Sequence, residues 1–156
     1  MVRTAQVINE LRQQFLDNIK DPNSQRRQDN KPWVFSHEPN TALTPNVQLF
    51  EVDSTFENRS VGTVGQFERA RIQATVRLKV NAEYDFDSDD ELETASDGLN
   101  WLVNELTETV LNDHEAIVDG FNGLYYVIPD ISSSVQETGQ TLEKSVDFIA
   151  YMERGN

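Results

Sequence analysis

Apolar side chains near the start of the chain recur with a helical period. Between residues 4 and 20 they are spaced three and four positions apart, the pattern of an amphipathic helix. Thr4 can cap the start of this helix, and Asp21 with Pro22 ends it. Residues 21–32 contain no apolar side chain other than proline, so we expect an exposed loop there.

A second amphipathic stretch covers residues from about 89 to 112 and follows an acidic turn at 83–90. Ser88 and Glu91 have the spacing of a capping box, and the acidic residues around them favour the positive end of a helix dipole. Gly98 costs roughly 1 kcal/mol relative to alanine inside a helix, which suggests that it marks close packing.

Residues 67–82 carry the clearest pattern in the chain. Seven apolar residues, from Ala70 to Ala82, alternate with seven polar residues, from Arg69 to Asn81. This period of two predicts a β-strand with one buried face. At roughly 3.3 Å per residue such a strand is about 45–50 Å long, well above the usual length. It therefore either projects beyond its domain or pairs with another subunit.

Shorter strands are expected on both sides of this one. A turn or flexible hairpin tip is expected at 53–66, where asparagine and glycines gather, and Trp33-Val34-Phe35 is either a strand or an anchor. The other strands are expected at 46–52, 124–128, 131–137 and about 142–152. We therefore predict a single α+β domain over residues 1–156, with an antiparallel sheet of about 4–5 strands and two main helices packed on one face.

Charge is distributed unevenly along the chain. The net charge is -14, from 27 acidic and 13 basic residues. Residues 1–82 sum to +2, whereas residues 83–156 sum to -16. Only four of the bases are lysine, and an acidic, lysine-poor composition is typical of proteins that work in high salt. The alternative is an ordinary acidic protein. The imbalance argues against nonspecific binding to nucleic acid or anionic lipid.

Few patterns in the sequence suggest chemistry. There is no cysteine, no nucleophile motif and no phosphate-binding loop, and the two histidines, His37 and His114, lie far apart in the sequence. The run from Asp85 to Asp90 begins like a calcium loop, but its sixth position is Asp90 rather than glycine. No apolar run reaches the length of a membrane helix, and the start lacks a signal-peptide core. We expect a soluble protein that is not an enzyme and holds no metal or cofactor.

A basic stripe lies on the polar face of the long strand, formed by Arg69, Arg71, Arg77 and Lys79. Such a stripe can meet DNA, or it can pair with acidic residues of a neighbouring strand or subunit. We favour pairing with acidic residues, because opposite charges across strands are a common stabilising device.

The order of these segments, and their patterns of apolar and polar residues, resemble those of the small tail-terminator and tail-completion proteins of tailed viruses. The resemblance rests on an N-terminal amphipathic helix (TAQVINELRQQFLDNI), a long alternating strand (ERARIQATVRLKVNAEY), a second helix (SDDELETASDGLNWLVNELTETVL) and a closing strand (LEKSVDFIAYMER). It covers about residues 5–154. The acidic, lysine-poor composition is similar to that of viruses of halophilic archaea.

This resemblance implies a virion structural protein of the tail or neck, assembled in the host cytoplasm. It implies a homo-oligomer, usually a hexameric ring, that binds the tail tube protein on one face and a neck or connector protein on the other, with DNA only passing through the lumen. A closed ring needs two complementary patches on each subunit. The residues that we expect to form them are Arg69, Arg71, Arg77 and Lys79 against Asp89, Asp90, Glu93 and Asp97.

Three other interpretations remain open at this stage. The chain can be a tail tube subunit, which would stack into filaments rather than stop at one ring, or it can be another connector. It can be a binding or regulatory module of a halophilic cell. A small enzyme is the third, and a deep pocket with a raised-pKa carboxylate would favour it.

Overall fold

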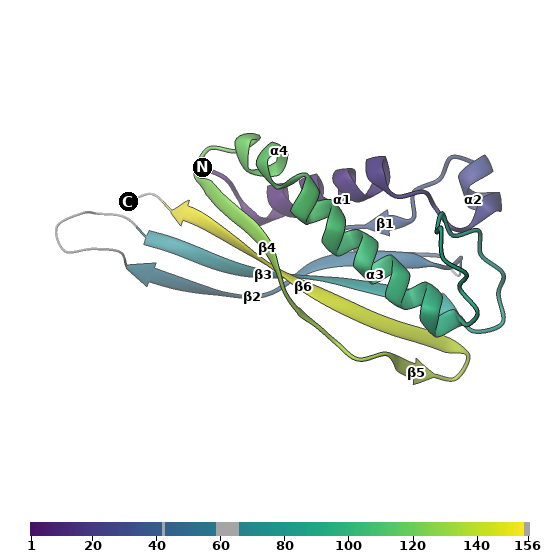
Figure 1. The fold of residues 1–156 in the computed structure, drawn as a ribbon. Helices are drawn as coiled ribbons and strands as arrows, with labels where there is room; N and C mark the ends of the chain where they lie inside the picture. Colours follow the sequence, from purple (N-terminus) through teal and green to yellow (C-terminus); the bar gives the residue numbers. More distant parts are fainter. Residues whose placement is uncertain (42, 59–65, 155–156) are drawn as a thin grey trace.

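A layer of helices covers one face of a twisted β-sheet (Figure 1). The structure is a computed structural model, and it describes residues 1–41, 43–58 and 66–154. The helices are α1 (Thr4–Asn18), α2 (Ser24–Gln28), α3 (Ala95–Asn112) and α4 (His114–Asp119). The strands are β1 (Val34–Phe35), β2 (Asn46–Asn58), β3 (Gln66–Lys79), β4 (Leu124–Ser132), β5 (Gln136–Thr138) and β6 (Thr141–Arg154).

The sheet has the spatial order β1-β2-β3-β6-β4, and β5 pairs with β6. The pairs β2–β3, β3–β6 and β4–β6 are antiparallel. The two-residue strand β1 runs parallel to β2, so the sheet is mixed rather than wholly antiparallel. The predicted α+β class, with the two main helices on one face, is confirmed. Trp33 and Val34 are buried, so this short cluster is both a strand and an anchor.

The alternating pattern of β3 determines how the sheet packs. Ala70, Ile72, Ala74, Val76 and Leu78 are all fully buried beneath the helices. The polar residues between them face away from the helices, and of these only Thr75 is buried. Helix α1 lies over β1 and β2, while α3 lies over β3, β6 and β4. The prediction of a long strand with one buried face is therefore confirmed.

The strands extend beyond the helical layer at one end. β2 and β3 are 13 and 14 residues long, and they pair continuously to Asn58 and Gln66 apart from a bulge between Glu51 and Asp53. In Figure 1 this end of the hairpin projects past the helices. A turn or hairpin extension is expected at 53–66; residues 53–58 and 66 are strands of the extended hairpin rather than a turn, and residues 59–65 lie outside the described residues.

The second helix begins later than the sequence pattern indicates. α3 starts at Ala95, and its capping box is formed by Thr94 and Asp97 rather than by Ser88 and Glu91. Residues 83–93 form no helix or strand. The ring of Phe86 fills the space over Gly98. The segment that contains Phe86 therefore packs against the side of α3 and does not form the first turns of that helix.

Two further predictions are wrong in detail. Residues 21–32 are not simply an exposed loop, because they contain α2 and bury Asp21 and Arg26. The strand expected at 131–137 is divided, because β4 continues through Pro129 to Ser132 and β5 covers only three residues. None of the described helices combines the length and apolar character that a bilayer crossing requires.

Candidate functional site

The basic stripe of β3 lies on the sheet face opposite the helices, as expected, and Arg71 is at its centre. Arg71 Nη1 is 2.8 Å from Asp130 Oδ2 of β4 and 3.2 Å from Asp147 Oδ2 of β6. Its Nε is 3.9 Å from Asp53 Oδ1 of β2. The hydrogen bond to Asp130, with that to Asp147, holds the pKa of Arg71 above its usual value. Acidic groups from three strands therefore converge on this one guanidinium.

The other two arginines of the stripe also have acidic neighbours on adjacent strands. Arg69 Nε lies 3.1 Å from Glu57 Oε1, and Arg77 Nε lies 2.8 Å from Glu143 Oε2. The fourth member, Lys79, is exposed at the end of β3. Pairing with acids of neighbouring strands is therefore confirmed for three of the four. Their role in a contact between subunits stays a prediction.

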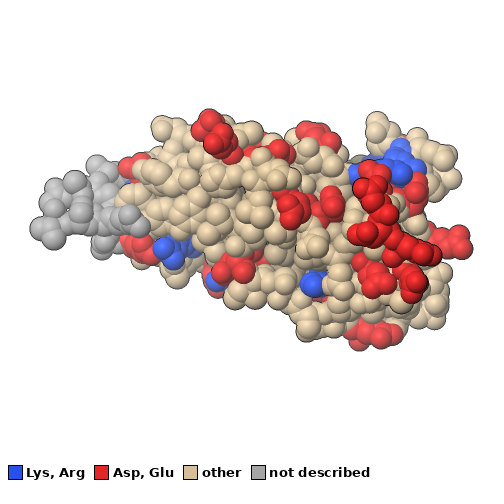
Figure 2. Space-filling view, viewed as in Figure 1, with Lys and Arg blue, Asp and Glu red and all other residues tan. Residues whose placement is uncertain are grey.

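The acidic members of the expected interface lie at the α2 end of the molecule. Asp97 is part of the helix cap: its Oδ2 accepts from the Thr94 N–H at 3.2 Å, and Thr94 Oγ1 accepts from the Asp97 N–H at 3.1 Å. Asp89, Asp90 and Glu93 are exposed in the segment before α3. Figure 2 shows acidic side chains gathered at this end. Among the described residues, no ion pair joins these acids to the basic stripe, although the Lys79 N–H donates to the Tyr84 hydroxyl just before them, at 2.9 Å.

Asp85 anchors the acidic segment to the rest of the protein. Its Oδ2 lies 2.9 Å from Lys20 Nζ and 3.0 Å from Arg27 Nη2, and its N–H donates to the Pro22 carbonyl at 2.8 Å. The hydrogen bonds from Lys20 and Arg27 hold the pKa of Asp85 below its usual value. The segment is thus held against α1 and α2 by charge.

Beside this anchor is an open cavity of about 530 Å³ between α1, α2 and the loop that leads to β1. Its cationic lining residues are Arg12, Lys20, Arg27 and Lys31. Two of the four are held by Asp85, and Arg12 Nε donates to the Val34 carbonyl at 2.9 Å. Asp85 brings one negative charge, and Asp21, which also lines the cavity, is paired with Arg26, so the cleft keeps a net positive charge.

A buried ion pair lies behind this cleft. Arg26 is only 2% exposed, and its Nε and Nη2 donate to the two carboxylate oxygens of Asp21 at 2.7 and 2.8 Å. Arg26 Nη2 also donates to the Pro45 carbonyl, which joins α2 to the start of β2. The sequence pattern did not predict this pair. The five-residue spacing from Asp21 to Arg26 was its only signal, and spacing does not reveal burial.

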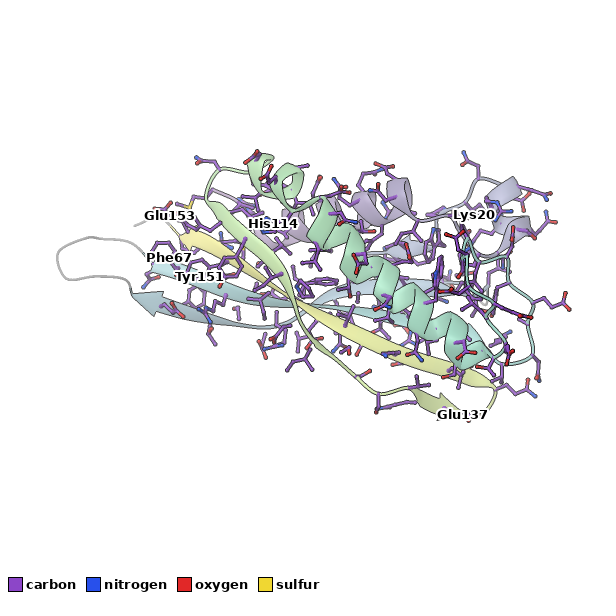
Figure 3. All side chains as sticks on the ribbon, in the orientation of Figure 1. Lys20, Phe67, His114, Glu137, Tyr151 and Glu153 are labelled. Atoms are coloured by element: carbon purple, nitrogen blue, oxygen red, sulfur yellow. The ribbon has the colours of Figure 1, made fainter. Side chains whose placement is uncertain are left out.

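An aromatic cluster forms at the hairpin end of the outer sheet face (Figure 3). The ring of Tyr151 is stacked between Phe67 and Tyr126, with centroid distances of 5.3 and 5.0 Å. The guanidinium of Arg69 lies 5.5 Å from the centre of the Tyr151 ring. Tyr125 donates to Glu153 Oε2 at 3.0 Å, and this hydrogen bond raises the pKa of Tyr125. The sequence pattern did not predict this cluster.

His114 has a structural partner in the fold. Its Nε2 accepts from the Val127 N–H at 3.4 Å, so that α4 is joined to β4. His37 lies in an exposed loop with its ring 5.7 Å from that of Phe35. Within the described ranges, no group of three or more potential metal-ligating side chains is found.

A comparison with protein-family models finds no match to this chain, and a comparison with curated protein sequences finds none either.

Proposed function

We propose that this chain is a virion structural protein that caps a tail tube as a ring and joins it to the neck. The observation that carries the proposal is the β2–β3 hairpin, whose strands of 13 and 14 residues extend past the helices (Figure 1). An extension of this kind gives a small domain a contact surface away from its own core. A structural subunit needs such a surface to reach a neighbouring subunit or a tube.

Exposed groups of opposite charge support a ring in particular. A closed cyclic assembly uses head-to-tail contacts, so each subunit must present two different patches. The acids Asp89, Asp90 and Glu93 are exposed before α3, and the exposed Lys79 ends β3, where its N–H donates to the Tyr84 hydroxyl at 2.9 Å. Because Arg69, Arg71 and Arg77 have partners within the chain, Lys79 is the member of the stripe best placed for a partner subunit.

Charge reversal at exposed positions tests the ring. Lys79→Glu should abolish rings in sizing with light scattering, and Lys79→Glu combined with Asp90→Lys should restore them. Both residues are exposed, so the fold should persist, as a retained amide spectrum would show. Glu115→Lys on α4 changes the net charge by +2, as Asp90→Lys does, at an exposed position outside both groups, and serves as the control for that substitution. Rings that survive Lys79→Glu unchanged would reject this interface.

The form of the assembly also distinguishes a tail terminator from a tail tube subunit. A tail tube subunit stacks into long filaments when purified, whereas a terminator stops at one ring. Filaments would therefore favour a tail tube subunit, which is also a virion structural protein, over a terminator.

A further inference from the structure

One edge of the sheet is open over most of its length. β1 pairs with β2 only at Val47 and Gln48, while β3 occupies the other side of β2 throughout. Beyond Gln48, no strand within the described ranges pairs with the outer edge of β2. The main-chain groups of such an edge form a template on which another strand can pair.

The opposite edge of the sheet is protected. In β4 the Val127 N–H is directed to His114 Nε2, and two residues later Pro129 has no N–H to donate. Helix α4 packs against the same strand. These features are the usual defences of an edge strand, and they are present on β4. The contrast singles out β2 as the edge that is left available.

Exposed apolar side chains accompany the open edge. Val52 is 46% exposed and Phe56 is 60% exposed, and both lie on β2 beyond the part that β1 covers. After the bulge between Glu51 and Asp53, residues 54–58 pair in regular register with β3. This regular run is about as long as a typical strand of 5–6 residues. It therefore offers a straight edge with an apolar anchor at Phe56.

The charges on β2 decide what kind of strand fits. Glu51 and Asp53 are exposed carboxylates at the edge. An antiparallel pair formed by two copies of β2 and centred on Val52 places Glu51 opposite Asp53. A pair centred on Asp53 places that residue opposite itself. Like charges directly opposite each other destabilise a sheet, so these two registers disfavour a second copy of β2.

We propose that the outer edge of β2 binds an extended, lysine- or arginine-rich segment of another protein, which joins the sheet as an added strand. Main-chain hydrogen bonds supply the affinity in this mode of recognition, and side-chain contacts supply the specificity. Here the specificity comes from Phe56, which packs against apolar residues of the segment, and from Glu51 and Asp53, which attract its basic residues. The inference concerns a partner of the hairpin and does not require that the chain form a ring.

A synthetic octapeptide that alternates lysine with valine is a suitable probe. Titrated into ¹⁵N-labelled protein in the lowest salt that keeps the amide spectrum folded, it should shift the amides of residues 53–57 and slow their hydrogen exchange. Phe56→Lys should weaken binding by roughly tenfold. Ile131→Lys is the matched control, because Ile131 is equally exposed but lies on β4, and it should leave the affinity within about twofold.

Four results would overturn the proposal. The peptide can fail to bind, or it can bind without protecting residues 53–57. A peptide that alternates glutamate with valine can bind as tightly as the lysine peptide. Protection of residues 53–57 that rises with protein concentration alone would assign the edge to a second copy of this chain.

Discussion

The ring of Phe86 lies directly over Gly98, so that a β-carbon built on Gly98 would stand only 2.6 Å from two of the ring carbons. The same ring makes an edge contact with Trp101 at a centroid distance of 5.6 Å. Phe86 belongs to the acidic segment, and Gly98 and Trp101 belong to α3. This contact therefore fixes a segment without regular structure onto the helix that follows it.

Gly98→Ala tests that contact. In an open helix the change would stabilise the protein by about 1 kcal/mol, because alanine is the better helix former. Here the new methyl group must displace Phe86, and we expect a net loss of about 1–3 kcal/mol, measured by urea unfolding. Gly120→Ala is the control, since its nearest contact would be an acceptable 3.4 Å. A Gly98→Ala protein at least as stable as the parent would contradict the packing.

The buried pair of Asp21 and Arg26 should be sensitive to loss of one partner. Asp21→Asn leaves the Arg26 charge buried without its carboxylate, and we expect unfolding to become easier by about 3–5 kcal/mol. Glu143→Gln removes the partner of Arg77 in a more exposed pair, and the expected loss there is below about 1 kcal/mol. Equal losses of unfolding free energy in the two variants would mean that burial does not make the Asp21–Arg26 pair more important for stability than the exposed pair.

Protonation of Glu105 should stabilise the folded protein as the solution becomes acidic. Burial, with the nearby charges of Glu108 and Asp87, raises the pKa of Glu105 above its usual value. The folded state therefore holds this proton more tightly than the unfolded state, and stability rises as pH falls through the raised pKa. Glu105→Gln should be more stable than the parent at neutral pH, and the difference should vanish in acid. Urea unfolding at a series of pH values measures it, and a less stable variant at neutral pH would refute the assignment.

Asp85 should show the opposite dependence. Its pKa is lowered in the folded protein by Lys20 and Arg27, so its contribution to stability is present above the unfolded pKa and is lost as pH falls through the folded pKa. Asp85→Asn should therefore be less stable than the parent at neutral pH and converge with it in acid. Because Asp85 is exposed, added salt should reduce the difference. A difference that is independent of both pH and salt would exclude an ionic anchor.

The sequence analysis succeeded where a single local pattern decides the structure. Alternation over residues 67–82 correctly predicts a long half-buried strand, because each apolar residue needs only the period of its own strand to reach the core. The unusual glycine at 98 correctly indicates close packing. The cross-strand partners of Arg69, Arg71 and Arg77 follow from the density of acidic residues on neighbouring strands.

The features that the sequence pattern did not predict depend on contacts between segments that are far apart in the chain. The buried Arg26 belongs to a stretch with no apolar side chain other than proline, and only its position behind β2 and the partner Asp21 explain its burial. The start of α3 was misplaced because Ser88 and Thr94 can both begin a capping box, and the packing of Phe86 on Gly98 selects Thr94. The open edge of β2 could not be foreseen, because it depends on β1 being only two residues long.

Electron microscopy of the purified protein in molar salt distinguishes a ring from the other possible assemblies. Salt at this concentration screens the self-repulsion of a chain with net charge -14, whereas opposite charges buried in direct contact between subunits are screened much less. The account predicts closed single rings, one subunit layer thick, in most of the particles. Long filaments, or particles no larger than a monomer or dimer, would contradict it.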